Sequence, residues 1–381
     1  MDKQHVIKDE CKPRIKNIIE GMPGNCDAIF LWSDTIVDKN LMYVTGLTSS
    51  KNEGVAVLLE KSGKVTLFSP SRDQELNRRQ ASYDEFVVWS KLQERDEIIK
   101  KTLSKFYKIG LCFGSLLHSS YRTIEEIFED RNSIFDVTDL FAKCRSIKSP
   151  DEIDKIKRAC AIVSELTVIL PTFLHEGMRE LDLAAEVEYH MKKMGSDDPA
   201  FSTIVAFGKN TSVPHHSSGA ATLMKNDIVL IDFGAEVEGY KSDITQVYFM
   251  GTPDWYKMHM YNKVLGAQEV AIKMIKDGVK SEDVVKAAKD YTTACHRYKD
   301  TWIHGLGHGI GLDIHDSMYP EVFKEGMILT VEPGIYLPGK YGVRLEDDIL
   351  VTKDGCEVLT DTHKEYQDMG QTYRGMNRTT K

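Results

Sequence analysis

One glycine- and histidine-rich stretch, residues 302–316, sets the tightest limits on the fold. It reads Trp-Ile-His-Gly-Leu-Gly-His-Gly-Ile-Gly-Leu-Asp-Ile-His-Asp, with glycine at every second position from Gly305 to Gly311. Glycine is disfavoured inside a helix, and in a strand it marks a face that another group approaches closely. The stretch therefore predicts an extended strand, although a glycine-rich turn with incidental histidines is the alternative. The face opposite the glycines carries His304, Leu306, His308 and Ile310.

Two apolar runs downstream of residue 220 each end in an acid. Residues 228–234 carry Asp232, and residues 327–334 carry Glu332. Each run is followed by a turn and a second strand with another acid, Asp243 or Glu346. The midpoints of the two acid pairs fall inside the predicted turns, so we expect the acids to face one another across each hairpin. Buried carboxylates are costly unless they are paired or bind a metal, whereas solvent-exposed strand ends would need no such explanation.

These four carboxylates together with His308 have the composition of a two-metal site. Four negative charges balance two divalent cations, and carboxylates can bridge metals about 3.5–4 Å apart. An oxygen-rich set with one imidazole favours manganese or cobalt, with iron or zinc as alternatives. Water between two such cations loses a proton near neutral pH and becomes a nucleophile. The sequence therefore predicts metal-dependent hydrolysis of an unactivated bond such as an amide.

Composition excludes several other classes of function. A formal net charge of −9 gives no electrostatic footprint for nucleic acid. The seven cysteines are scattered and form no Cys-x-x-Cys pair, so neither a disulfide framework nor a thiolate zinc site is expected. No apolar run approaches the roughly 20 residues that span a bilayer, and the first residues lack the apolar segment of a signal peptide. We therefore expect a cytoplasmic protein that binds neither nucleic acid nor membrane.

The chain is expected to form two domains of mixed α/β (α+β) class. Residues 1–145 alternate short apolar runs with charged helical segments, which indicates a mixed sheet covered by helices. Ser149-Pro150-Asp151-Glu152 has the residues of a helix start and marks the boundary. Residues 151–365 contain a weak internal echo, 177–185 against 278–288, which predicts a duplicated helix–helix–hairpin unit around a pseudo-two-fold axis. A polar tail follows at 366–381.

Five segments of the second domain occur together in the order typical of one family. They resemble the pita-bread metallopeptidases, which include prolidase, Xaa-Pro aminopeptidase and methionine aminopeptidase, with creatinase as a non-metal relative. The first domain is similar to the creatinase-type N-terminal domain, with residues 40–46 as its best signature. The five segments are Val213-Pro214-His215-His216, residues 231–234 with 242–245, Gly307-His308-Gly309-Ile310-Gly311, residues 330–334, and residues 344–348.

The resemblance implies a role for each predicted metal ligand. Asp232 would chelate the first metal, and Asp243 and Glu346 would bridge the pair. His308 and Glu332 would complete the second metal. Glu332 would also be the catalytic acid/base that handles the proton of the bridging water.

The resemblance also implies roles for residues around the metals. His215 and His315 would be catalytic and bind the substrate carbonyl and the developing oxyanion. His304 would lie in the substrate pocket near the proline ring. Thr245 and Arg344 lie two residues from bridging acids, on the same strand face, and would support the ligands.

Three further positions are interpreted differently. The side chain of His216 should point away from the site if that of His215 points in, and Asp347 and Asp348 are interpreted as structural. Many prolidases carry an arginine four residues after the second histidine, where it clamps the free carboxylate of a dipeptide. Here that position is Tyr319. Either another cation binds the carboxylate, or longer peptides are accepted.

The predicted function is hydrolysis of the Xaa-Pro bond in dipeptides or short peptides by a metal-bridging hydroxide. The partners are then proline-containing peptides, and the resemblance suggests a homodimer. One alternative is a non-catalytic pita-bread module that binds peptide or protein. Another is a metal-dependent lyase or amidohydrolase on the same fold.

Overall fold

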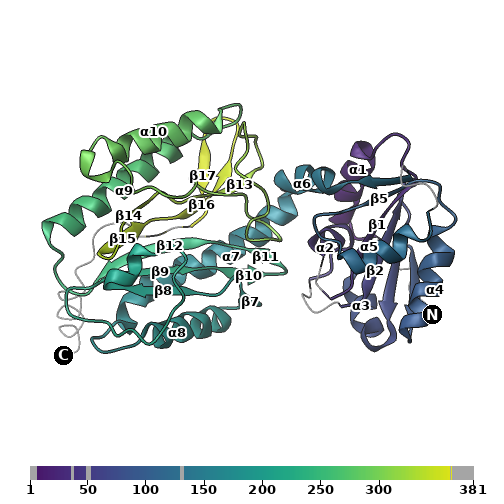
Figure 1. The fold of residues 1–381 in the computed structure, drawn as a ribbon, viewed down its shortest axis with the longest axis horizontal. Helices are drawn as coiled ribbons and strands as arrows, with labels where there is room; N and C mark the ends of the chain where they lie inside the picture. The colour runs from purple at the N-terminus through teal and green to yellow at the C-terminus, as the bar shows by residue number, and fades with distance from the viewer. Residues whose placement is uncertain (1–6, 36–37, 49–52, 129–132, 361, 363–381) are drawn as a thin grey trace. The chain divides into compact units, whose positions relative to one another are not determined.

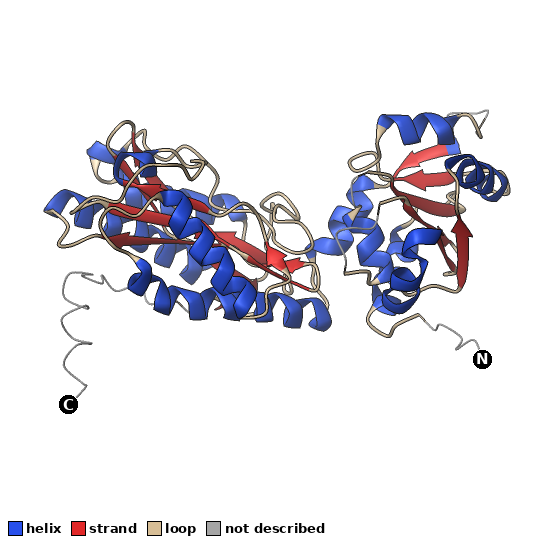
Figure 2. Cartoon of the chain, turned by 90° about the horizontal axis from the view of Figure 1, so that it is seen from below, coloured by secondary structure: helices blue, strands red, loops and turns tan. Residues whose placement is uncertain are grey.

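The computed structural model describes residues 7–35, 38–48, 53–128, 133–360 and 362. The chain divides into two compact units, residues 1–145 and residues 146–381. The predicted polar tail, 366–381, lies outside the described residues. Among the residues that are described, we find no helix with the length and apolar character needed to span a membrane. Figures 1 and 2 show the helices and strands of each unit.

The first unit is built on a six-stranded mixed sheet in the order β4-β3-β2-β1-β5-β6. The central strand β1 pairs antiparallel with β2 and parallel with β5. Every residue of β1 is buried, because helices cover the sheet. The strands are β1 (Ala28–Ser33), β2 (Val55–Glu60), β3 (Val65–Pro70), β4 (Glu85–Trp89), β5 (Ile109–Leu111) and β6 (Ile134–Asp136). The helices are α1 (Cys11–Gly21), α2 (Lys39–Thr45), α3 (Gln74–Gln80), α4 (Leu92–Leu103), α5 (His118–Glu125) and α6 (Thr138–Ser146). The predicted mixed α/β class is confirmed.

The second unit begins at the predicted helix start. Ser149 caps α7 (Pro150–Ile169) by accepting a hydrogen bond from the Glu152 amide, and the Glu152 carboxylate accepts one from the Ser149 amide. This reciprocal capping satisfies amides that the first helical turn leaves without a partner. The helix gives way to a short 3-10 turn that contains Pro171, which cannot continue it. The capping signature is confirmed.

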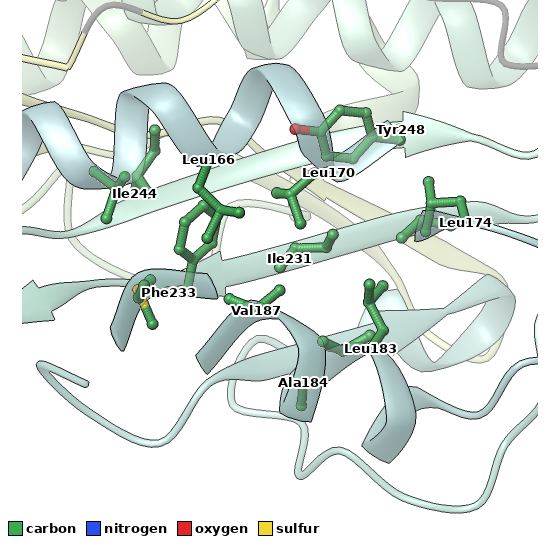
Figure 3. Packing of buried hydrophobic residues seen from close by; sticks show 14 of the residues in the cluster. Leu166, Leu170, Leu174, Leu183, Ala184, Val187, Ile231, Phe233, Ile244 and Tyr248 are labelled. Atoms are coloured by element: carbon green, nitrogen blue, oxygen red, sulfur yellow. The ribbon is translucent and has the colours of Figure 1, made fainter. Parts of the chain in front are cut away.

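The order of elements in this unit is repeated, as the internal echo predicts. Two helices and a set of antiparallel strands are followed by two more helices and another set of strands. In the first set, side chains of α7 and α8 pack on the inner face of β9 and β12, as Figure 3 shows for Leu166, Val187 and Ile231. The first set contains α7, α8 (Glu180–Lys193), β8 (Ile204–Phe207), β9 (Ile228–Phe233), β10 (Ala235–Val237), β11 (Tyr240–Lys241) and β12 (Ile244–Phe249). The second contains α9 (Trp255–Met274), α10 (Ser281–Thr293), β13 (Ile328–Val331), β14 (Gly334–Leu337), β15 (Tyr341–Arg344), β16 (Asp347–Val351) and β17 (Cys356–Val358).

The strand registers decide which acids oppose one another. In the second hairpin, the flanking pairs Val331↔Asp347 and Gly334↔Arg344 place Glu332 opposite Glu346, in agreement with the predicted midpoint.

In the first hairpin the predicted register is wrong. Asp232 is opposite Thr245, and Asp243 lies two residues further toward the turn, on the same face. The reason is the turn itself, because Glu238 and Gly239 adopt positive φ of 51° and 84° and shift its centre by one residue.

The glycine- and histidine-rich stretch is not the continuous strand that its alternation predicts. It contains only isolated bridges at Gly309. Its middle nevertheless runs along β13, since His308 O accepts from Thr330 N at 2.9 Å and Leu306 O accepts from Glu332 N at 2.8 Å. Close approach explains one glycine directly, because a Cβ on Gly307 would lie 2.1 Å from Thr330 O.

Candidate metal centre

The five predicted metal ligands come from five separate places in the second unit. Asp232 is the second-to-last residue of β9, and Asp243 directly precedes β12. Glu332 follows β13, Glu346 lies between β15 and β16, and His308 lies beside β13. His308 Nε2 is 3.5 Å from Asp243 Oδ2 and 3.6 Å from Glu332 Oε1. Ligand atoms of Asp243, His308 and Glu346 all lie within 4.8 Å of one another, the spacing of a group that could hold a metal ion.

Several carboxylate oxygens of this cluster are buried without a hydrogen-bond partner among the described residues. They are Asp232 Oδ1, Asp243 Oδ1 and Glu346 Oε1. Burial raises the pKa of Asp243 well above its usual value, and the neighbouring carboxylate of Glu346 raises it further. Burial likewise raises the pKa of Glu332 to about 7. So many acids can ionise together only if positive charge is supplied, and divalent cations fit this demand.

The histidine of the cluster has the protonation state that a metal ligand needs. Burial, followed by the positive potential of His315, lowers the pKa of His308 to about 4. The imidazole is therefore neutral at physiological pH, with a nitrogen lone pair free to coordinate. Its Nε2, the atom near Asp243 and Glu332, faces the carboxylates. The donor set is thus oxygen-rich with one neutral nitrogen, which suits divalent metals of intermediate hardness.

Arg344 links acids of both hairpins. Its guanidinium donates to Asp232 Oδ2 at 2.5 Å through Nη2 and to Thr245 Oγ1 at 2.9 Å through Nε. Thr245 in turn donates to Glu346 Oε2 at 2.6 Å. All four residues of this chain, Asp232–Arg344–Thr245–Glu346, are buried. Each of the two acids has one oxygen in a hydrogen bond and a second oxygen, Asp232 Oδ1 or Glu346 Oε1, that has no partner among the described residues. Thr245 and Arg344 therefore lie where supporting residues are expected to lie.

Tyr336 and Asp348 are part of the surroundings that sequence reasoning missed or did not connect. Tyr336 OH accepts from Arg344 Nη1 at 2.9 Å and lies 3.0 Å from His304 Nε2. Asp348 Oδ2 accepts from the Asp243 amide at 2.9 Å and fixes the backbone of that ligand. Tyr336 lies four residues after Glu332, and an even spacing places two side chains on the same face of an extended chain. This spacing could have indicated that Tyr336 lies near the acids.

The two predicted carbonyl-binding histidines are exposed side chains on loops. The ring of His315 lies 4.2 Å from that of His308, centroid to centroid. His215 follows Pro214, whose carbonyl oxygen accepts from Arg344 Nη1 at 3.3 Å. Both loops therefore reach the carboxylate cluster, one through His308 and the other through Arg344.

Three more predicted positions are located by their contacts. The ring of His304 lies 6.4 Å from that of Trp302 and 5.4 Å from that of Tyr336, centroid to centroid, and burial lowers the pKa of His304 to about 4. The side chain of His216 contacts Glu180, at 2.8 Å from Nε2 to Oε2. Tyr319 packs edge-on against Phe323, and its hydroxyl is buried. The position that would carry a carboxylate-binding arginine is thus an aromatic packing residue.

Two family models together match most of the chain. Residues 154–353 match the model of metallopeptidase family M24, and residues 14–147 match that of the creatinase/prolidase N-terminal domain. The chain is 34% identical over 363 residues to an Xaa-Pro dipeptidase of Pyrococcus furiosus, with 93% of this chain and 99% of that protein covered.

Solved structures give the same family. An Xaa-Pro dipeptidase from Bacillus anthracis superposes with a TM-score of 0.85 at 31% identity, covering 93% of this chain and 99% of that one. An X-Pro aminopeptidase from Thermotoga maritima does so with a TM-score of 0.82 at 31% identity, covering 91% and 99%. These matches confirm the predicted fold, a creatinase-like domain followed by a pita-bread domain, and imply divalent metal ions. The chain belongs to metallopeptidase family M24 and is a prolidase-type peptidase.

Proposed function

We propose that this enzyme holds two divalent metal ions and cleaves the Xaa-Pro bond of dipeptides or short peptides. The observation that carries the proposal is the cluster of buried acids around one neutral imidazole: ligand atoms of Asp243, His308 and Glu346 lie within 4.8 Å of one another, and Glu332 lies 3.6 Å from His308. The negative charge of Asp232 acts on the same group, since it raises the pKa of Asp243 and of Glu332. Four negative charges match two divalent cations, and the oxygen-rich set favours manganese or cobalt. Relatives named for Xaa-Pro cleavage support the choice of bond.

Five residues would hold the two ions. Asp232 would hold the first, His308 and Glu332 would hold the second, and Asp243 and Glu346 would contribute to both. When bound, such cations would lower the pKa of a water molecule enough for it to serve as the nucleophile near neutral pH. Asp348 accepts a hydrogen bond from the Asp243 amide and would hold this ligand in place for the ions.

The remaining chemistry belongs to side chains around the cluster. Glu332 accepts the proton of the attacking water at its carboxylate and passes it to the proline nitrogen as that group leaves. His215 and His315 donate hydrogen bonds to the carbonyl oxygen as negative charge develops there. Trp302 and His304, backed by Tyr336, form an aromatic wall for the proline ring.

Tyr319 favours substrates longer than a dipeptide. Its ring packs on Phe323 and offers no positive charge to a free carboxylate. A tripeptide has no carboxylate on the proline residue, so it needs no cation at this point. The relatives include both dipeptidases and an aminopeptidase, and we propose that this chain accepts Xaa-Pro-Yaa as well as Xaa-Pro.

The test is cleavage by the purified full chain, loaded with manganese or cobalt, of Met-Pro, Ala-Pro and their tripeptide extensions. We expect cleavage of both lengths, two metal ions per chain by elemental analysis, and loss of activity with chelator. No cleavage of any Xaa-Pro peptide, with both ions present, would refute the substrate class. Fewer than one bound ion per chain would instead support the non-catalytic binding module. The homodimer and the cytoplasmic location stay predictions.

A further inference from the structure

The two histidines proposed to bind the carbonyl have little to hold them in place. His215 lies in the loop 207–219 and His315 in the loop 309–317, and both side chains are exposed. Neither residue belongs to a helix or a strand. A carbonyl-binding group must nevertheless be placed accurately, since an error of about 1 Å can cost a factor of about 100 in rate. The order of each loop must therefore come from neighbouring residues.

A buried carboxylate closes the first loop. Glu180, the first residue of α8, is fully buried and contacts His216 Nε2 at 2.8 Å. Its Oε1 accepts from the Phe207 amide at 2.9 Å, and its Oε2 accepts from the Gly219 amide at 3.0 Å. The Asn210 side chain donates to the same group at 2.8 Å. One carboxylate thus ties together both ends and the middle of the loop 207–219.

A buried ion pair closes the second loop. Lys148, next to the cap of α7, lies 3.3 Å from Asp316, measured from Nζ to Oδ2. The two side chains are 1% and 2% exposed. Asp316 Oδ1 also accepts from the Asp313 amide, and the Asp316 amide donates to Gly309 O at 2.8 Å. The pair therefore joins the segment that precedes α7 to the turn that carries His315.

We propose that Glu180 and Lys148 are positioning residues that set His215 and His315 for catalysis. In each loop the exposed histidine is directly followed by a residue whose side chain is fastened to a buried charged partner. Breaking such a contact leaves a buried charge or donor unpaired, which loosens the loop rather than the whole domain. The proposal rests on the proposed function, because that function gives the two histidines their task.

The test compares conservative variants with matched surface controls. Lys148→Met and Glu180→Gln remove one charge each with little change of shape, and Lys148→Arg restores the charge. The control for the first is Lys157→Met on α7, the helix that begins two residues after Lys148; its pair with Glu357 is 42% and 50% exposed. The control for the second is Asp182→Asn, which breaks the exposed contact with Arg179 two residues from Glu180.

The first measurement needs no substrate. Hydrogen–deuterium exchange of the metal-loaded protein should speed up in residues 309–317 for Lys148→Met and in residues 207–219 for Glu180→Gln. Exchange elsewhere, and in both controls, should stay at the wild-type rate. Unchanged exchange in both loops would overturn the proposal whatever the substrate is. If Lys148→Met fails to fold, the double variant with Asp316→Asn removes both buried charges and is measured instead.

The second measurement is steady-state cleavage of Ala-Pro or its tripeptide. We expect kcat to fall about tenfold or more in both variants while metal content stays the same and KM changes little. Lys148→Arg should recover most of the loss in kcat, because it restores the positive charge beside Asp316. A general defect in folding would not change kcat alone. Faster loop exchange with wild-type kcat would overturn the positioning role. An inactive wild type would refute the proposed function instead, and exchange would still report on the loops.

Discussion

Replacing Asp243 with asparagine should stabilise the metal-free protein and destabilise the metal-loaded protein. Asp243 is buried, one of its oxygens has no partner among the described residues, and a ligand atom of Glu346 lies within 4.8 Å. Two unit charges at that distance repel by about 3 kcal/mol at an effective dielectric of about 20. Partial protonation relieves part of this repulsion, so we expect a gain of about 2 kcal/mol at pH 8.

That gain is large enough to measure by thermal unfolding. For a domain of this size, about 2 kcal/mol corresponds to a rise in Tm of roughly 4–8 °C. In chelator, Asp243→Asn should therefore unfold at a higher temperature than the wild type. With manganese at 100 times its dissociation constant, the wild type gains about 2.7 kcal/mol. The variant lacks the charge of one proposed ligand and should gain much less, so we expect the order of the two Tm values to reverse.

The reversal separates a metal ligand from an ordinary buried acid. The control is Asp154→Asn, which removes a carboxylate that is 72% exposed on α7 and should leave Tm within about 1 °C in both conditions. A metal-free Asp243→Asn protein less stable than the wild type would refute the argument from charge repulsion. An equal rise in Tm with manganese in both proteins would show that Asp243 is not a ligand.

Three other outcomes follow from the same geometry. His315→Ala should keep its metal but lose about 10²–10³ in kcat, and wild-type turnover would contradict its role at the carbonyl. Gly307→Ala should cost about 1–3 kcal/mol in denaturant unfolding, because its Cβ would lie 2.1 Å from Thr330 O. Gly305→Ala, with no atom nearer than 3.7 Å, is the matched control and should cost less. Metal-free stability should fall as pH rises from about 4.5 to 7, since Glu332 has a pKa of about 7 in the folded protein against an ordinary 4.5. The folded state binds more protons than the unfolded state in that window, and Glu332 alone should lower the free energy of unfolding by about 3 kcal/mol. Urea unfolding in chelator measures this. A free energy of unfolding that does not fall would contradict the burial of the Glu332 charge.

The sequence predicted the site wherever short-range rules apply. Acids at the ends of apolar strands indicated buried carboxylates, and in the structure Asp243, Glu332 and Glu346 lie close to His308 or to one another. The capping residues Ser149 and Glu152 located the start of α7 correctly, because their reciprocal hydrogen bonds join residues only three positions apart. Period-two spacing indicated that Thr245 and Arg344 are near the acids, although each contacts an acid of the other hairpin, Glu346 and Asp232 respectively, rather than the one two residues away.

Two kinds of feature escaped prediction. The first hairpin register depended on which residues take positive φ, and Glu238 does so without being a glycine. Long-range contacts had no local signal at all. Lys148 and Asp316 are 168 residues apart, and Glu180 and His216 are 36 apart. Only the folded chain shows that these charges meet.

The centre is divided between the two repeated halves of the domain. The first half carries Asp232 and Asp243, and the second carries His308, Glu332 and Glu346. The loop 250–254, between β12 and α9, is the covalent link between them. A chain cut in this loop would give two fragments, each with an incomplete set of the proposed metal ligands. Peptide cleavage would then occur only after the fragments reassociate, which would make this fold suitable for a split enzyme whose output reports that two fused proteins have met.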